Sequence, residues 1–336
     1  MRVTYTEPFW IIDDSGFLDP ELADIERAVF GSDISVDYGL FKDGFTTSGQ
    51  DLIDYVSGTD ALVIYRCHVT PQLVEAIAPT CRVVVRCGVG IDNLSPELLR
   101  RAGIASFNVP DYCGDEVCCH TLALLLALER QVCVQDRKVR ANEWGILTGG
   151  MPRRLSMRTA GIVGFGRIGR ATARKLQAFY AHVTAYDPYV SADLMASHGV
   201  TAAESLGQLF AVSDAVVLHA ALTEETDQLI SSEVLAQARP GAFLVNTARG
   251  RLVDITAVVR ALEKGRLGGF ASDVFSPEDP NDDPVARELL DRDDVVVSAH
   301  RAFLSVESQL SLRRRVAETV AAVLRGEAPP AEGRVT

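Results

Sequence analysis

The sequence contains no long hydrophobic run. Its longest apolar stretch near the start, residues 9–12, is followed at once by two aspartates, and nowhere do about 18 apolar residues stand together. We therefore expect no signal peptide, no membrane span and a cytoplasmic location. Internal repeats and low-complexity tracts are missing as well, so neither a repeat array nor a disordered chain is indicated.

Excess positive charge is also absent. The 336 residues include 33 lysines and arginines against 45 aspartates and glutamates, a net charge of −12, and the basic residues form no extended run. Nucleic acids and anionic membranes are therefore poor partners. With 47% apolar and 23% charged residues, the composition is that of an ordinary folded protein, and the length indicates two domains.

Paired cysteine motifs are missing too. The seven cysteines, an odd number without a Cys-x-x-Cys pair, are Cys67, Cys81, Cys87, Cys113, Cys118, Cys119 and Cys133. This pattern predicts reduced thiols in a cytoplasmic protein. Cys118, Cys119 and His120 are adjacent, but consecutive helix residues point in different directions, so we expect no metal site.

What the sequence does contain is alternation of short β-branched runs with helix-period segments, which predicts parallel sheets covered by helices. The first series predicts strands at 2–6, 61–65, 82–86 and 104–108, with helices at 71–77 and 96–101. A second series begins with a strand at 159–163. Between them, 116–139 predicts one long helix, apolar on almost every face over 121–128, suited to burial between domains or subunits.

A glycine-rich turn follows the strand predicted at 159–163. Its sequence is Gly164-Phe165-Gly166-Arg167-Ile168-Gly169, which has G-x-G-x-x-G spacing. The first glycine allows a tight turn, the second a close approach of pyrophosphate, and the third close packing of helix on strand. The next strand ends at Asp187, where a carboxylate accepts hydrogen bonds from a ribose diol and repels a 2′-phosphate. The turn therefore predicts an NAD site.

Three further polar residues, Arg249, Glu278 and His300, follow predicted strands. Ligands of open parallel sheets bind at the carboxyl ends of the strands, so we expect these side chains at one edge. Reduction of a 2-oxo acid needs a proton donor and a cation for the carboxylate, roles suited to histidine and arginine. A carboxylate beside the imidazole orients it and favours its protonated form.

With these motifs in place, the chain resembles the NAD-dependent D-isomer-specific 2-hydroxyacid dehydrogenases over about 61–324. The motifs that carry the resemblance are 86–93, 108–112 with Glu116, the glycine turn with 186–188, 219–226, 246–250 with 253–254, 273–275 with Glu278, and His300. The resemblance implies a catalytic triad of Arg249, Glu278 and His300. It implies cofactor contacts from Gly164, Gly166, Arg167, Ile168, Gly169, Asp187, His219, Thr226, Thr247, Ala248 and Asp273. The Val89–Gly90 amides are expected to hold the substrate carboxylate.

The resemblance also implies an α/β fold in two domains. A Rossmann-type, doubly wound parallel sheet that binds NAD, 110–300, is expected to be inserted into a smaller flavodoxin-like substrate domain, 1–109 and 301–336. The family usually forms a homodimer through the long helix and its neighbours.

The sequence departs from the family pattern at several positions. Ala221, Ala299 and Asp279 stand where the family has proline, which affects loop stiffness and removes no reacting group. Arg301 follows the expected catalytic histidine, and residues 300–305 are most similar to the branch that includes the C-terminal-binding-protein corepressors. An NAD-sensing scaffold on the same fold is therefore the alternative to an enzyme.

The arginines near the expected substrate site bear on its charge. Besides Arg249, the substrate-facing segments carry Arg66, Arg86 and Arg301. Extra guanidinium groups imply either carboxylate partners in the protein or a second anionic group on the substrate. Pairing of Arg86 or Arg301 with Asp92, Glu278 or surface carboxylates is the first alternative. Glyoxylate, hydroxypyruvate, pyruvate, phosphoglycerate and phosphonate analogues all remain open.

Overall fold

The computed structural model describes residues 1–42, 44–147 and 149–336, and the chain folds into two compact units. Unit 1 comprises Met1–Tyr112 and Ser305–Thr336, and unit 2 comprises Cys113–Leu304. These boundaries lie three to four residues beyond those expected from the sequence. In the described parts of the chain no single helix is long and apolar enough to cross a membrane, although two consecutive helices bent by 61° pass that test together.

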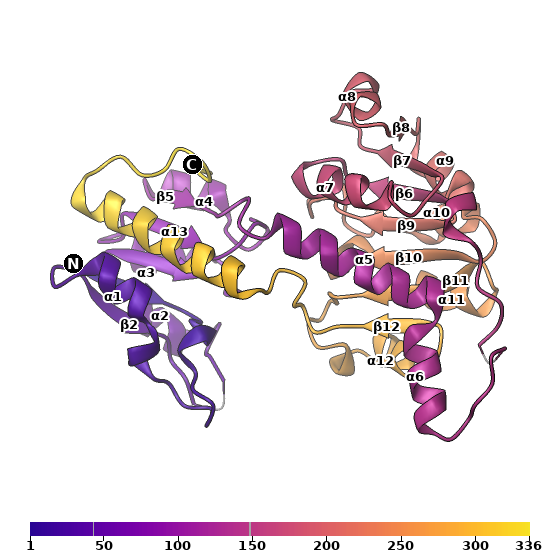
Figure 1. Ribbon diagram of the computed structural model, residues 1–336. Coiled ribbons are helices and arrows are strands. Elements are labelled where there is room, and N and C mark those ends of the chain that lie inside the picture. Colours follow the sequence, from indigo (N-terminus) through magenta and orange to yellow (C-terminus); the bar gives the residue numbers. More distant parts are fainter. Residues whose placement is uncertain (43, 148) are drawn as a thin grey trace. The chain divides into compact units, whose positions relative to one another are not determined.

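Unit 1 is built on a parallel sheet in the order β2-β1-β3-β4-β5 (Figure 1). Its strands are β1 (Arg2–Tyr5), β2 (Ser35–Tyr38), β3 (Ala61–Ile64), β4 (Val83–Arg86) and β5 (Ala105–Phe107). Its helices are α1 (Asp24–Phe30), α2 (Gln50–Val56), α3 (Pro71–Ile77), α4 (Pro96–Arg101) and α13 (Val306–Arg325). The strand order is that of flavodoxin-like sheets, which confirms the predicted fold.

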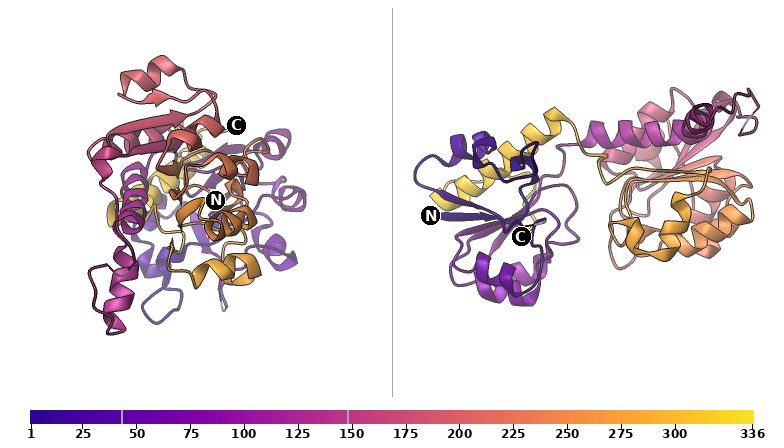
Figure 2. Two further views of the ribbon diagram at one scale, coloured as in Figure 1. Left: turned by 90° about the vertical axis from the view of Figure 1, so that its right-hand side faces the viewer. Right: turned by 90° about the horizontal axis from the view of Figure 1, so that it is seen from below.

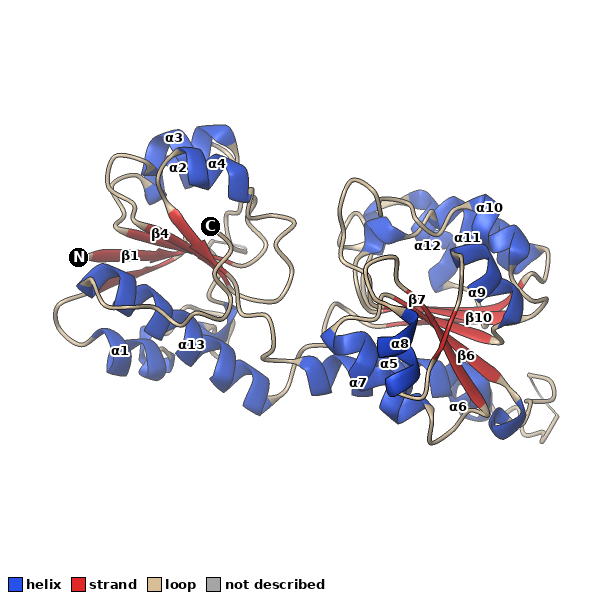
Figure 3. Cartoon of the chain, turned by 90° about the horizontal axis from the view of Figure 1, so that it is seen from above, coloured by secondary structure: helices blue, strands red, loops and turns tan. Residues whose placement is uncertain are grey.

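The last helix explains why the chain returns to unit 1. Helix α13 packs beside α1 on one face of the sheet, and α2, α3 and α4 cover the other face (Figures 2 and 3). Leu312, Val316 and Val320 of α13 are fully buried in one cluster with the strand residues Val3 and Val85. Unit 1 therefore needs both ends of the chain to complete its core, and unit 2 is inserted between them.

Unit 2 is built on a second parallel sheet, in the order β12-β11-β10-β9-β6-β7-β8. Its strands are β6 (Thr159–Val163), β7 (His182–Tyr186), β8 (Thr201–Ala202), β9 (Ala215–Leu218), β10 (Ala242–Asn246), β11 (Leu267–Ser272) and β12 (Val295–Val297). Its helices are α5 (Gly114–Arg130), α6 (Val132–Arg140), α7 (Arg167–Leu176), α8 (Ala192–Ser197), α9 (Leu206–Val212), α10 (Ser232–Gln237), α11 (Ile255–Glu263) and α12 (Pro284–Leu290). The strand order reverses between β6 and β9, as it does in Rossmann folds. Ligands of such sheets bind at the point of this reversal.

The long helix predicted over 116–139 is wrong in one respect, because the chain forms two helices there. Gln131 adopts a left-handed conformation with φ of 56°, and the axis bends by 61° between α5 and α6. A left-handed residue cannot continue a right-handed helix, so the backbone ladder is interrupted. Neither proline nor glycine marks the break in the sequence.

Candidate functional site

The glycine turn between β6 and α7 has the geometry that its spacing predicts. Gly164 has a φ of 88°, and a Cβ there would lie 2.6 Å from the backbone nitrogen of Ala220. A Cβ on Gly169 would lie 2.2 Å from the carbonyl oxygen of Gly164. A Cβ on Gly166, in contrast, would meet nothing within 4 Å. Two glycines are thus required by packing, and the third faces open space.

The open space above Gly166 lies at the amino end of α7. No side chain caps this ten-residue helix, whose first residues are Arg167 and Ile168. Free N–H groups at a helix start and the positive end of its dipole bind phosphate. The turn therefore fits the pyrophosphate of a dinucleotide.

Asp187 follows β7 and lies against the same turn. Its Oδ2 accepts a hydrogen bond from the backbone N–H of Phe165 at 2.7 Å, and its Oδ1 accepts one from Tyr189 at 2.9 Å. These bonds fix the carboxylate beside the glycine turn while each oxygen keeps a lone pair. A ribose diol can use those remaining acceptors.

The other residues expected along the cofactor have protein partners in this structure. His219 Nε2 lies 2.9 Å from Thr172 Oγ1, and burial lowers the pKa of His219 to about 4, so the imidazole is neutral near pH 7. Thr226 Oγ1 donates to the carbonyl of Ala221 and closes its own loop. Thr247 Oγ1 lies 2.7 Å from Thr121 Oγ1. Their cofactor contacts, and that of Ala248, stay predictions.

Arg249, Glu278 and His300 come from three neighbouring strands. They follow β10, β11 and β12, which are adjacent in the sheet, so their loops share its carboxyl edge. The side chains of His300 and Glu278 are in contact, because His300 Nδ1 lies 2.5 Å from Glu278 Oε1. An ionised carboxylate can only accept, so Nδ1 carries the proton and Nε2 is left for substrate.

The buried side chain of Asn246 fixes the backbone around Arg249. Asn246 is 1% exposed, donates from Nδ2 to the carbonyl of Arg249 at 2.8 Å, and accepts from the N–H of Ala248 at 3.0 Å. One buried amide thus fixes the turn that carries the arginine. Arg249 Nη1 donates to the carbonyl of Ala248 at 2.8 Å.

His300 is held in an unusual backbone conformation by Asp273. His300 has a left-handed φ of 46°, a strained region for a residue with a Cβ. Its N–H donates to the Asp273 carbonyl at 2.7 Å, and the N–H groups of Arg301 and Ala302 donate to the Asp273 carboxylate at 3.0 and 2.8 Å. Asp273, expected to contact the cofactor, thus anchors the loop of His300.

Unit 1 carries the remaining candidate residues. Two guanidinium groups lie near the ring of Tyr65, with Arg66 Cζ 5.8 Å and Arg86 Cζ 5.7 Å from the ring centroid. Glu7 is 3% exposed, and its carboxylate accepts the backbone N–H groups of Tyr65, Arg66 and Cys67 at 3.0–3.3 Å. This buried carboxylate fixes the start of the loop that presents Arg66.

The loop of Val89 and Gly90 is fixed in a similar way. Asn108 Nδ2 donates to the carbonyl of Val89 at 2.7 Å. Gly88 has a φ of 140°, and a Cβ there would lie 1.4 Å from Arg86 Nη1. Glycine at 88 is therefore needed to let the Arg86 guanidinium lie across the loop.

Several of these supporting residues were not identified from the sequence. Glu7 follows β1 and Asn108 follows β5. The rule that singled out Arg249 and His300, a polar residue just past a strand, applies equally to them. No such rule applies to Thr121 and His120 on α5. A polar residue within an apolar helix suggests that it has a hydrogen-bond partner, but the sequence does not show which residue that partner is.

A group of metal-ligand side chains lies on the first turns of α5. Ligand atoms of Asp115, Cys118 and Cys119 lie within 4.8 Å of one another, a set different from the adjacent Cys118, Cys119 and His120. Lys175 Nζ donates to Asp115 Oδ1 at 2.9 Å, so an ammonium group already serves as the cation there. The expected lack of a metal site stays a prediction.

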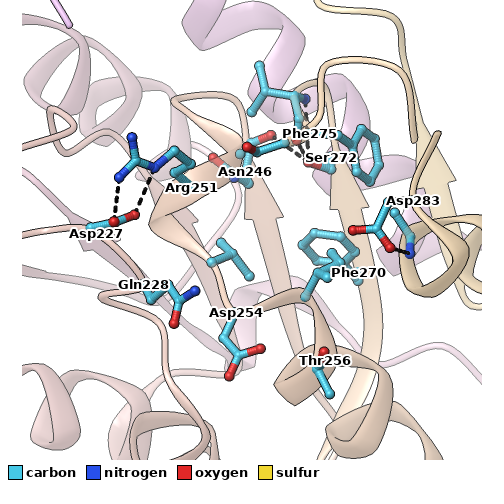
Figure 4. A pocket seen from close by; sticks show the side chains of 16 residues that line it. Asp227, Gln228, Asn246, Arg251, Asp254, Thr256, Phe270, Ser272, Phe275 and Asp283 are labelled. Atoms are coloured by element: carbon cyan, nitrogen blue, oxygen red, sulfur yellow. Dashed lines mark hydrogen bonds and ion pairs between the residues drawn. The ribbon is translucent and has the colours of Figure 1, made fainter. Parts of the chain in front are cut away.

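A cavity of about 330 Å³ lies behind the Arg249 loop (Figure 4). Asn246, Gly250 and Phe275 form its wall on that side, and Arg251, paired with Asp227, lines its rim. The residues around it do not include the expected triad. The cavity thus adjoins the turn at 246–251 and lies apart from the expected triad.

Fold and site together define a doubly wound dinucleotide-binding domain with a histidine–carboxylate pair at its carboxyl edge. The family model of the D-isomer specific 2-hydroxyacid dehydrogenase, NAD binding domain, matches residues 122–302. Glyoxylate reductase of Korarchaeum cryptofilum is 36% identical over 309 residues, 91% of this chain and 92% of that protein. The chain belongs to the D-isomer specific 2-hydroxyacid dehydrogenase family.

One further relative and one solved structure are also similar to this chain. D-3-phosphoglycerate dehydrogenase of Mycobacterium leprae is 36% identical over 281 residues, 83% of this chain and 52% of that protein, so this chain spans about half the length of that relative. D-lactate dehydrogenase of Aquifex aeolicus, solved with NAD and lactic acid, superposes with a TM-score of 0.86. It covers 100% of this chain and 99% of its own at 23% identity, and therefore supports the fold alone.

Proposed function

We propose that this protein is an oxidoreductase that uses NAD(H) to interconvert small 2-oxo and 2-hydroxy acids. The observation that carries the proposal is the contact of His300 with Glu278, at the edge of a sheet whose glycine turn fits a dinucleotide. The matched relatives are named as dehydrogenases and reductases, which favours an enzyme over the scaffold alternative.

Each residue of the triad has a defined task in this proposal. Bound NADH supplies the hydride for the carbonyl carbon. His300, held at Nδ1 by Glu278, donates the Nε2 proton to the oxygen of the carbonyl as charge develops there. Arg249 pairs with the substrate carboxylate and polarises the carbonyl, and the amides of Val89 and Gly90 add hydrogen bonds to that carboxylate. Oxidation runs through the same groups in reverse.

Asp187 supports NAD over NADP as the cofactor. The carboxylate is fixed beside the glycine turn by Phe165 and Tyr189, and it would repel the phosphate of NADP. Pro188 and Tyr189 follow it, so no basic residue stands directly behind it to neutralise that phosphate.

The substrate that we propose carries a second anionic group, a carboxylate, phosphate or phosphonate. Arg66 and Arg86 flank Tyr65 on the loops expected to face substrate, and Arg301 follows the catalytic histidine. Over the described residues the Arg301 guanidinium makes no ion pair that would occupy it, and its side chain is exposed. A fork of this kind matches a planar or tetrahedral anion.

The test is a panel of 2-oxo acids with matched chain lengths and one or two anionic groups. Oxidation of NADH is followed by absorbance, and dianionic acids are expected to exceed pyruvate and glyoxylate in kcat/KM. Arg301→Ala should remove most of that advantage. An equal effect on all acids would make Arg301 structural, and a complete lack of turnover would favour the scaffold.

We also propose that two copies of this chain form a cytoplasmic homodimer. Large apolar side chains cluster on α6 and the segment after it: Val132 (57% exposed), Val139 (44%), Trp144 (86%), Ile146 (92%), Leu147 (64%), Met151 (75%) and Met157 (77%). Such a patch is typical of a protein interface. Light scattering should give twice the chain mass, and Trp144→Asp with Ile146→Asp should lower that mass. The control Phe17→Asp, at a side chain that is 69% exposed, should leave the mass unchanged.

A further inference from the structure

A chain of hydrogen bonds connects helix α5 to the loop of His300 within unit 2. His120 Nε2 lies 2.8 Å from Ser298 Oγ, and Ser298 Oγ lies 2.5 Å from Asp273 Oδ1. The Asp273 side chain is completely buried, and the His120 side chain is 24% exposed. Asp273 in turn binds the N–H groups of Arg301 and Ala302.

The protons in this chain can be assigned from valence. Both oxygens of Asp273 accept backbone N–H groups, as expected of a carboxylate. A carboxylate has no proton to give, so the Ser298 hydroxyl must donate to it. That donation uses the only proton on Ser298 Oγ, which can then only accept from His120. His120 therefore carries a proton on Nε2.

The carboxylate at the end of this chain is costly to bury. Burial by itself raises the pKa of Asp273, but donors from His120, Ser298, Arg301 and Ala302 outweigh it and lower the pKa below its usual value. Loss of one donor leaves the others to satisfy the same charge. Because two of those others are the N–H groups of the His300 loop, the loop geometry depends on the whole set.

We propose that His120 is a positioning residue for the reaction, acting through Ser298 and Asp273 to hold the loop that carries His300. His120 lies on α5, whereas Ser298 and His300 both follow β12. The chain of donors runs in one direction, from His120 to Ser298 to Asp273. It thereby keeps the acceptors of Asp273 directed at the loop and maintains the left-handed backbone at His300.

The inference rests on the proposed function, because turnover is one of its readouts. His120→Gln keeps a donor at the position of Nε2, and His120→Leu keeps the volume without a donor. Cys119→Ala, on the next residue of the same helix, is the matched control. Each variant is compared with the wild-type full chain for kcat and KM with the best 2-oxo acid, for NADH affinity, and for the unfolding midpoint.

We expect His120→Leu to lower kcat at least tenfold with a much smaller change in KM, and His120→Gln to restore most of it. Ser298→Ala should resemble His120→Leu, and the double variant should be no worse than either single one, since both break the same chain. Cys119→Ala should match the wild type. Equal kcat in the leucine and wild-type enzymes, or additive losses in the double variant, would overturn the inference.

A second readout does not need turnover. Nitrogen-15 NMR of histidine-labelled protein should show the His120 proton on Nε2. Ser298→Ala should shift the His120 ring signals, because the Nε2 proton then has only the Asp273 carboxylate, 3.5 Å away, as its acceptor. A wild type without activity on any 2-oxo acid but with this NMR signature would defeat the proposed function and leave the hydrogen-bond chain standing. An Nδ1–H form of His120 in the wild type would reverse the donor order and overturn the inference.

Discussion

His300 and Glu278 lie 22 residues apart in sequence, and their side chains meet with 2.5 Å between Nδ1 and Oε1. They come from the loops after two adjacent strands, β12 and β11. The contact fixes the ring and leaves Nε2 free, which is the arrangement that a proton donor needs. The charge and the orientation that Glu278 provides can be separated by substitution.

Glu278→Gln keeps a hydrogen-bond acceptor for Nδ1 and removes the negative charge, whereas Glu278→Ala removes both. We expect kcat for reduction to fall about tenfold in the glutamine variant and about a hundredfold in the alanine variant. Steady-state kinetics with NADH and one 2-oxo acid measure both. Equal losses would show that charge alone matters, and no loss in either would remove Glu278 from the mechanism.

Gly166→Ala should separate cofactor binding from folding. An added Cβ at 166 meets no protein atom within 4 Å, so the unfolding midpoint should stay the same while NADH affinity falls at least tenfold. Gly169→Ala is the comparison, because its Cβ would lie 2.2 Å from the Gly164 carbonyl and should destabilise the fold. Unchanged NADH affinity in Gly166→Ala, measured by calorimetry, would contradict this account of the turn.

The cofactor preference should depend on Asp187. The wild type is expected to favour NADH over NADPH strongly in kcat/KM, and Asp187→Ala should narrow the ratio at least tenfold by removing the repulsion of the 2′-phosphate. Both cofactors are compared with the same 2-oxo acid at saturation. Equal or better efficiency with NADPH in the wild type would show that Asp187 has another task.

A buried ion pair should dominate the stability of unit 2. Glu129 is 1% exposed, pairs with Arg158, and accepts from the Tyr180 hydroxyl at 2.8 Å. Burial raises the pKa of Glu129, and Arg158 opposes that rise. Glu129→Gln leaves the Arg158 guanidinium with only the more distant carboxylate of Asp214, 3.8 Å away, which should cost about 3 kcal/mol of unfolding free energy.

The control for that measurement is the exposed pair Asp136 and Arg140 on α6. Asp136→Asn should change the free energy of unfolding by less than about 0.5 kcal/mol. Urea titrations of both variants give the comparison. Adding Arg158→Met to Glu129→Gln should recover part of the loss, because the buried guanidinium is then removed as well. If Glu129→Gln and Asp136→Asn both lowered the unfolding free energy by similarly small amounts, the buried pair would not be the more important of the two.

His219 should make the fold sensitive to mild acid. Its pKa is about 4 in the folded protein, below the usual 6.5, so the unfolded chain binds the proton more readily between those values. Stability therefore falls as the pH drops from about 6.5 to about 4, by about 2 kcal/mol at pH 5. His219→Gln cannot take up that proton and should lose less between pH 7 and pH 5 in thermal unfolding. Identical losses would contradict the assignment.

The sequence was sufficient for the parallel sheets and the glycine turn, because both depend on local patterns. The strand at 159–163 and the helices at 71–77 and 96–101 have the predicted bounds. The break at Gln131 was missed, because nothing in its side chain requires a left-handed backbone. The edge strand β2, with the sequence Ser-Val-Asp-Tyr, was missed because it lacks a continuous apolar run.

The supporting residues of the site were harder to predict, since their partners are backbone groups distant in sequence. Glu7 binds N–H groups about 60 residues away, and Asp273 binds those of Arg301 and Ala302. Backbone donors look the same at every position in a sequence. Only the folded chain shows which of them a buried carboxylate satisfies.

The most direct test of the central claim is NADH oxidation by wild type and His300→Ala across the panel of 2-oxo acids, with NADH affinity measured in parallel. The account predicts turnover by the wild type with at least one acid, a loss of about a hundredfold or more in kcat in His300→Ala, and unchanged NADH binding. Comparable turnover in the two proteins would contradict the role of His300 as the proton donor.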